Sequence, residues 1–293
     1  MEELLAAYRA YLRRERGLAA TTVGAYGKVA RLFLSQRSGP DGLDVEHLSA
    51  GDVVEFVLAQ CHQSSVGSAE YVVTALRCLP RFPHVEGWTG QQLAHAVPAV
   101  AGGRTGLPKA LDAAQVTALM ASCDQDSAVG LRDYAILVLL ARLGLRAGEV
   151  ADPRLADVDW RAGQIEVTGK ARRSERLPLP ADVGQALAAY LRGGRPRVDD
   201  RTLSVRARAP HGPLGAGGVK TVVRGACDRA GLPRVGAHRL RHTAATEMLR
   251  AGAPLSEIAQ VLRHRSLSTT AIYAKVDLAA LRPLALPWPG GGA

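Results

Sequence analysis

Several features that mark well-known protein classes are scarce or missing in this chain. Aromatic residues make up only 4% of it, and its four cysteines are scattered, with no Cys-x-x-Cys pair: Cys61, Cys78, Cys123 and Cys227. This pattern argues against a disulfide framework or a cysteine zinc site, and it predicts reduced thiols in the core. No apolar run approaches the roughly 18 residues that a membrane-spanning helix needs. A P-loop, a Rossmann glycine pattern and a Gly-x-Ser-x-Gly elbow are also lacking, so nucleotide-binding and serine hydrolase functions have no support.

The composition instead indicates a helical, basic protein. Its 293 residues suffice for two domains, and 47% hydrophobic residues with few aromatics predict cores of Ala, Leu and Val. The net charge is +10 and the sequence pI is about 9.9. Residues 1–100 hold 9 basic and 10 acidic side chains, whereas residues 101–293 hold 28 and 17. The excess positive charge therefore lies in the second part of the chain, where it indicates a polyanionic partner.

The first part of the chain, residues 1–97, reads as a small all-α domain. Apolar spacing, caps and breaks predict helices at 2–16, ended by Gly17; from a Thr21 or Thr22 cap to about Ser35; at 50–60; and at 68–79. Lys28 and Arg31 face outward on the second helix, as either a solvated surface or a DNA contact. Residues 98–111 have the proline, glycine and small residues of a linker.

The second part is expected to add a small β-hairpin to a helical domain. Helices are predicted from an Asp112 cap to about Ser122, from Leu131 to Leu143 before Gly144, at 181–192 and at 217–230. Two short strands, Gln164–Thr168 and Glu175–Leu179, flank a basic loop. Residues 192–202 read as an exposed loop. The expected fold class is therefore mainly α with a small β-hairpin or sheet (α+β).

Residues 237–277 carry the strongest chemical signal, a set of side chains suited to a phosphate: His238, Arg241, His264 and Tyr273. The segment is expected to form three helices, with a stop at Gly252, a proline in the first turn at Pro254 and an N-cap at Ser268. His238 and Arg241 lie three residues apart, so they share one face of the first helix.

Two basic residues outside this segment have both an ordinary and a functional interpretation. Arg146, in GLRAGEV, either pairs with Glu149 or Asp152 or clamps a phosphate in the bidentate way that a guanidinium allows. Arg241 admits the same two interpretations. Lys170 opens the hairpin loop, where a lysine is a solvated side chain, a phosphate contact or the proton donor to a departing alkoxide.

The histidines and the tyrosine also need weighing. His238 and His242 form an H-x-x-x-H pair, but Arg239 and Arg241 beside them disfavour a bound dication, so we expect no metal. Tyr273 taken alone would be a core or interface residue, and its hydroxyl, with an unperturbed pKa near 10, is by itself a weak nucleophile. A surrounding base and cationic groups would favour its phenolate and neutralise a five-coordinate phosphate.

Six residues in the order R…K…H-x-x-R…H…Y resemble, position by position, the catalytic set of the tyrosine recombinases, the phage integrase family. They lie in GLRAGEV, TGKARRSERLPL, HRLRH, LRHRS and AIYAKVD: Arg146, Lys170, His238, Arg241, His264 and Tyr273. The resemblance covers about residues 110–290 and implies a catalytic domain at 112–281. Residues 1–97 look like the family's helical core-binding (SAM-like) DNA-binding domain, and residues 282–293 resemble a tail that docks on a neighbouring subunit.

The resemblance also implies the reaction. Tyr273 would attack the scissile phosphodiester, giving a 3′-phosphotyrosyl link and a free 5′-hydroxyl. The other implied roles are phosphate clamp for Arg146 and Arg241, general acid for Lys170, acceptor of the tyrosine proton for His238, and additional donor for His264. No metal, ATP or other cofactor is implied.

The implied partner is double-stranded DNA with a specific recombination site. The family works as a homo-tetramer on DNA, passes through a Holliday junction and can use accessory DNA-bending or directionality proteins. Expected DNA contacts are Arg172, Arg173, Arg239, Arg263, Arg265, Lys28 and Arg31. We expect a cytoplasmic, nucleoid-associated protein with no membrane contact. Integration, transposition and dimer resolution stay open as roles, and the alternatives are a type IB topoisomerase-like enzyme or a catalytically silent DNA-binding relative.

The sequence departs from the family at two positions. Arg263 stands where the family commonly has a glycine before the histidine, so we expect either a changed approach of His264 to DNA or an extra phosphate contact. Pro153 replaces a residue that is usually apolar, and we expect it to end its helix early.

Overall fold

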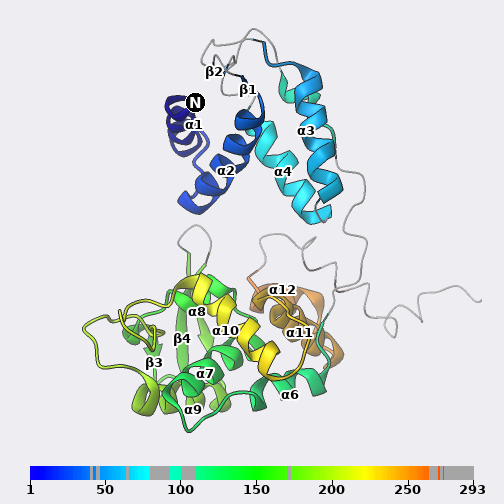
Figure 1. Ribbon diagram of the computed structural model, residues 1–293. Helices are drawn as coiled ribbons and strands as arrows, with labels where there is room; N and C mark the ends of the chain where they lie inside the picture. The colour runs from blue at the N-terminus through cyan, green and yellow to red at the C-terminus, as the bar shows by residue number, and fades with distance from the viewer. Residues whose placement is uncertain are drawn as a thin grey trace, which may run out of the picture. The chain divides into compact units, whose positions relative to one another are not determined.

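The computed structural model describes residues 1–39, 42–43, 47–63, 66–79, 93–99, 110–169, 173–263, 270 and 273. The chain divides into two compact units, Met1–Thr105 and Gly106–Ala293 (Figure 1). This division falls within the segment that was expected to be a linker. The domain boundaries expected at residues 97, 111 and 281 stay predictions, and the tail 282–293 lies outside the described residues.

The first unit is a bundle of helices. Its helices are α1 (Glu2–Arg14), α2 (Ala20–Gln36), α3 (Ala50–Gln63), α4 (Val66–Cys78) and the 3-10 turn η1 (Leu93–Ala96), and a two-residue pair, β1 (Ser38–Gly39) and β2 (Gly42–Leu43), follows α2. Helix α1 packs on α2, α2 on α4, and α4 on α3. Tyr8, Phe33 and Phe56 are buried in this core, with the two phenylalanine rings 5.2 Å apart.

Each helix expected in this unit is present, but one start signal was wrong. Helix α2 begins at Ala20 with Ala19 as its N-cap and no side-chain cap, so Thr21 and Thr22 lie inside the first turn. Gly17 has a φ of +57°, a backbone conformation that a glycine adopts without strain, and it follows the end of α1 as expected.

The second unit is built around one buried helix, and its small sheet contacts a short helix beside that one. Its helices are α6 (Ala113–Ala121), α7 (Ala128–Arg142), α8 (Ala147–Ala151), η2 (Leu155–Asp157), α9 (Ala181–Ala189), the π-helical turn η3 (Tyr190–Gly194), α10 (Gly215–Arg229), α11 (Ala237–Arg250) and α12 (Leu255–Val261). Helix α7 contacts α6, α8, α9, α10 and α11 (Figure 1). The fold is mainly helical with a small sheet, which confirms the expected class.

Local sequence signals explain where the helices around α7 begin and end. Asp112 and Gln115 form a capping box at α6: the Gln115 N–H donates to Asp112 Oδ1 at 2.7 Å, and the Asp112 N–H donates to Gln115 Oε1 at 3.1 Å. Helix α7 ends before Gly144, whose φ is +58°. Pro153 follows the five-residue α8, which confirms that this helix ends early.

The sheet is antiparallel, in the order β3 (Val158–Asp159), β4 (Gln164–Thr168), β5 (Ser174–Pro178). Ile165 pairs with Leu177 across the hairpin and with Val158 on the other side, and all three face the core. The hairpin was expected, whereas β3 was missed because two residues carry too short a pattern to read as a strand. The hairpin loop 170–172 lies outside the described residues.

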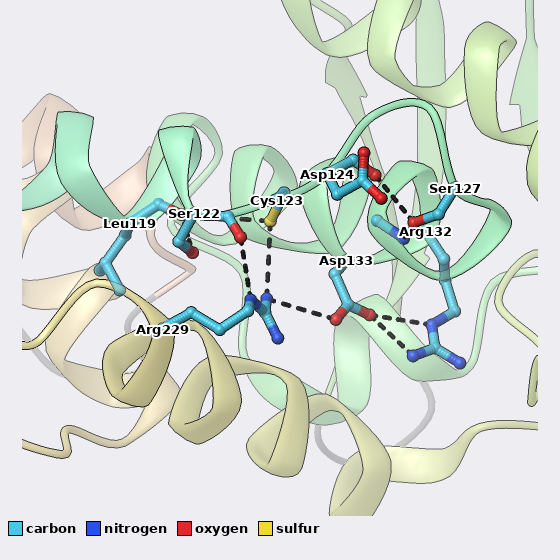
Figure 2. A network of polar contacts seen from close by, with 9 residues as sticks. Leu119, Ser122, Cys123, Asp124, Ser127, Arg132, Asp133 and Arg229 are labelled. Carbon is cyan, nitrogen blue, oxygen red and sulfur yellow. Dashed lines mark hydrogen bonds and ion pairs between the residues drawn. The ribbon is translucent and has the colours of Figure 1, made fainter.

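A buried carboxylate ties three helices of this unit together (Figure 2). Asp133, on α7, accepts hydrogen bonds from Arg132 Nη2 and Nε at 2.7 and 3.0 Å and pairs with Arg229 Nη2 at 3.5 Å. Arg229, on α10, also donates through Nε to the Ser122 carbonyl at the end of α6, at 2.9 Å. The charge of Asp133 is therefore paired and hydrogen-bonded, as burial requires.

Two further expectations need correction. The segment 192–202 is not simply exposed: Gly194 is buried, and Arg195 Nη2 donates to the carbonyls of Asp200 and Thr202, at 2.5 and 2.9 Å. Pro254 is the N-cap of α12 and not a residue of its first turn. Within the described residues, no helix has the length and hydrophobicity to cross a membrane.

Candidate active site

Arg146 sits at a tight junction between the buried helix α7 and the short helix α8. It is the N-cap of α8, where Glu149 Oε2 accepts its backbone N–H at 2.8 Å. Its Nη1 donates to Glu149 Oε1 at 2.6 Å. The ion pair with Glu149 that the sequence allowed is therefore present. The side chain of Arg146 is nevertheless 40% exposed, so its other face is open to a ligand.

Glu149 serves two arginines. Besides Arg146, it pairs through Oε2 with Nη2 of Arg263, at 2.6 Å. Burial works to raise the pKa of Glu149, but the Arg146 N–H, the charge of Arg263 and the Arg146 side chain together outweigh it, so the pKa lies below its ordinary value. Glu149 is therefore a carboxylate at neutral pH.

Arg241 is almost fully buried, at 1% exposure, and its guanidinium joins the ends of two helices. Nη1 donates to the Gly144 carbonyl after α7, at 2.6 Å, and Nη2 donates to the Leu262 carbonyl at the end of α12. Helix C-termini carry partial negative charge, which stabilises a cation there. Burial and the nearby Arg146 lower the pKa of Arg241 to about 10, so it stays charged at neutral pH.

Tyr273 is also buried, at 1% exposure, and its hydroxyl lies 2.7 Å from His242 Nδ1. The ring of His242 stands edge-on to the exposed His238, with the ring centroids 4.4 Å apart. Burial raises the pKa of Tyr273 above its usual value, although the charge of Arg241 partly opposes this. The tyrosine is therefore protonated in this state of the protein.

His242 is the residue that the sequence left out of the site. The resemblance assigned His238 as the acceptor of the tyrosine proton, whereas the hydroxyl meets His242 here. The signal was present in the sequence, because residues four apart on a helix share a face. The H-x-x-x-H spacing of His238 and His242 suggests a zinc site first, and this interpretation hides the role of His242 beside Tyr273.

All six expected catalytic residues fall within the range of the second unit, and the structure describes four of them: Arg146, His238, Arg241 and Tyr273. Arg241 interacts electrostatically with both Arg146 and Tyr273. Lys170 and His264 lie outside the described residues, as do Arg172 and Arg265.

The described residues that were expected to contact DNA lie in different environments. Arg173 is exposed directly before β5, and Lys28 is exposed on α2. Arg31 makes two hydrogen bonds to Glu2, at 2.5 and 2.7 Å. Arg239 lines a cavity of about 210 Å³ together with residues of α6, of the end of α10 and of the segment between α10 and α11. These DNA contacts stay predictions.

Comparison with known proteins decides the family. The family model described as Phage integrase family matches residues 109–279. The chain belongs to the phage integrase family. The integrase/recombinase y4rA of Sinorhizobium fredii, described as putative, is 46% identical over 99% of this chain and 72% of its own length. The tyrosine recombinase XerD of Mycobacterium tuberculosis is 32% identical over 98% of this chain and 96% of its own length.

Solved structures of recombinases and integrases share the fold of this chain, in agreement with its membership of the family. The XerA recombinase is 25% identical, with a TM-score of 0.52 over 96% of this chain and 97% of its own. A lambda integrase (75–356) dimer bound to a COC′ core site has a TM-score of 0.71 at 17% identity, over 93% of this chain and 94% of its own. At that identity the likeness shows the shared fold. This tyrosine recombinase thus has the fold and the family that its six-residue pattern predicted.

Proposed function

We propose that this tyrosine recombinase cuts and rejoins DNA at a specific site, with Tyr273 as the nucleophile. The observation that supports this most directly is the environment of the hydroxyl: Tyr273 lies against His242 and within the field of Arg241. The phenol oxygen attacks the scissile phosphorus, the P–O5′ bond breaks, and a 3′-phosphotyrosyl link and a free 5′-hydroxyl result. Because the link keeps the energy of the phosphodiester, rejoining needs no ATP.

The other groups of the site share the remaining work. Arg146 and Arg241 bind the non-bridging oxygens and neutralise the charge that develops on the five-coordinate phosphate. Lys170 protonates the departing 5′-oxygen, and His264 adds a donor. This cationic set replaces the metal ions that other phosphoryl-transfer enzymes use, so cleavage proceeds without a metal.

The proton of Tyr273 leaves through the histidine pair. In the DNA-free protein, the hydroxyl hydrogen-bonds to His242, whose ring is in contact with that of His238. His242 holds the hydroxyl before the reaction, and His238, the more exposed ring, is the acceptor during attack. A buried tyrosine cannot reach a DNA backbone, so Tyr273 must leave its position when DNA binds.

The partners follow from the charge and the family. The basic second part of the chain, with 28 basic and 17 acidic residues, binds the DNA backbone, and residues 1–97 add the core-binding domain. Two DNA sites are joined in a homo-tetramer through a Holliday junction; a solved lambda integrase tetramer is bound to such a junction. Accessory bending or directionality proteins and association with the nucleoid belong to the same proposal.

A covalent-trapping experiment tests this function. Nicked suicide duplexes tiled across the DNA that flanks the gene are incubated with the wild-type protein and with Tyr273→Phe. We expect an SDS-resistant adduct at one sequence, with the wild type only. Adducts on many unrelated sequences, with relaxation of any supercoiled plasmid, would mean a type IB topoisomerase-like activity. If the flanking duplexes give no adduct, the tiling is extended to the whole genome, and no adduct there would mean a silent DNA-binding relative.

A further inference from the structure

The backbone of Arg263 is in a conformation that disfavours a side chain. Its φ is +54°, and every other described residue with a φ in this left-handed region is a glycine. An L-residue there costs on the order of 1 kcal/mol. Such a conformation persists only where the surroundings hold it in place.

Those surroundings are a buried ion pair. Nη2 of Arg263 lies 2.6 Å from Glu149 Oε2, and the two side chains are 5% and 4% exposed. Nη1 donates to the Val261 carbonyl at 3.1 Å, and Nε is buried without a hydrogen-bond partner among the described residues. The side chain is therefore turned into the protein, toward the same carboxylate that holds Arg146.

Glu149 has one negative charge to divide between two guanidinium groups. Each of its oxygens lies 2.6 Å from one of them: Oε1 from Arg146 and Oε2 from Arg263. Without Arg263, the whole charge of a buried carboxylate would act on Arg146. Glu149 is buried and Arg146 is partly shielded from water, so the undivided charge would hold Arg146 more strongly at Glu149 and away from a ligand.

We propose that Arg263 is a positioning residue that neutralises Glu149 and so leaves Arg146 free to bind the scissile phosphate. The inference rests on the proposed function, because it concerns the phosphate of that same site. It also assigns Arg263 a role through Glu149, in place of the direct DNA contact expected from the sequence. The three arginines and one glutamate of the site leave two net positive charges to face the phosphodiester.

Variants at position 263 separate charge from backbone conformation. Asparagine tolerates a positive φ and is neutral, so Arg263→Asn removes the cation with little added strain. Arg263→Lys keeps the cation. Each is made in the wild type and with Glu149→Gln, which removes the negative charge and keeps the shape of the side chain. Adduct formation is timed at saturating suicide duplex, and DNA affinity is measured separately.

We expect Arg263→Asn to slow cleavage about tenfold, less than the roughly 10²–10³-fold that removal of a catalytic donor itself costs. DNA affinity should change little, and Arg263→Lys should recover most of the rate. With Glu149→Gln present, Arg263→Asn should cause no further loss. The inference would be overturned if Arg263→Asn cleaved DNA at the wild-type rate. It would also be overturned if Arg263→Asn slowed cleavage as much in the Glu149→Gln background as in the wild type. A loss confined to DNA affinity would also overturn it, because that is the result of a direct DNA contact.

A second measurement does not depend on cleavage. Inorganic sulfate should raise the melting temperature more in the wild type than in Arg146→Gln, because only the former has the intact anion site. We expect Arg263→Asn to lose most of this Arg146-dependent shift. If sulfate raises the melting temperature of Arg263→Asn as much as that of the wild type, the role of Arg263 is refuted, whether or not a DNA adduct forms. If the rise is diminished but no DNA adduct is found, only the proposed function is contradicted.

Discussion

The buried guanidinium of Arg241 should contribute to stability as much as to catalysis. It donates to two carbonyls, those of Gly144 and Leu262, which belong to the ends of different helices. Arg241→Lys keeps the charge but has one compact donor group in place of a planar fork, so it can meet one carbonyl and not both. A hydrogen bond from a charged group contributes about 1.5–3 kcal/mol. We therefore expect the free energy of unfolding to fall by about 2 kcal/mol.

Calorimetry tests this value. For a unit of this size, about 2 kcal/mol corresponds to a fall of roughly 4–8 °C in melting temperature. Arg250→Lys on the same helix is the matched control, because Arg250 is exposed and its ion pair is with Glu247, which is also exposed, at 2.8 Å. Exposed pairs contribute about 0–1 kcal/mol, so this control should melt close to the wild type. If Arg241→Lys melted at the temperature of the control, the assignment of Arg241 as a link between two helix ends would be wrong.

Other predictions concern packing, pH and the nucleophile. Gly130→Ala should prevent normal folding of the second unit, because a Cβ there would lie 1.7 Å from the Asp124 carbonyl oxygen; normal yield and melting temperature would contradict this. Ionised Glu149 stabilises the fold, and this contribution should be complete above pH 4.5. It should be lost as the pH falls through the pKa that Glu149 has in the folded protein, which lies below 4.5, and the acid unfolding curve of Glu149→Gln should lack this loss. His242→Phe should lower the free energy of unfolding by about 0.5–1.5 kcal/mol by removing the hydrogen bond between His242 Nδ1 and the Tyr273 hydroxyl, and adding Tyr273→Phe should cost little more; additive effects in calorimetry would refute the bond. Cleavage should be unchanged in EDTA, and lost activity that Mg²⁺ restores would show that a metal is needed.

Much of the fold could be predicted because its signals are local. The Asp112 cap, the stop at Gly144 and the alternation of the hairpin strands each act within a few residues, and the structure has them where the sequence indicates. The errors were local as well. Ala19 precedes α2 where a threonine cap was expected, because packing of the buried face of α2 sets its start more strongly than a cap does.

The active site was only partly predictable, for a different reason. The family pattern identified residue types in order, but it does not specify which side chains meet. Arg263 and Glu149 are 114 residues apart, and their contact depends on how α8 packs beside the end of α12. The contact between Tyr273 and His242 likewise joins residues 31 apart. Both contacts depend on tertiary packing, which periodicity and spacing do not encode.

The central claim of this account is that Tyr273 forms the covalent bond to DNA. Mass spectrometry of the trapped adduct tests it directly, because trypsin releases Tyr273 in the peptide SLSTTAIYAK, residues 266–275, where it is the single tyrosine. We expect fragment ions that place the nucleotide phosphate on Tyr273, with no modified peptide from Tyr273→Phe. A nucleotide on any other residue, or an adduct that persists in Tyr273→Phe, would contradict the account.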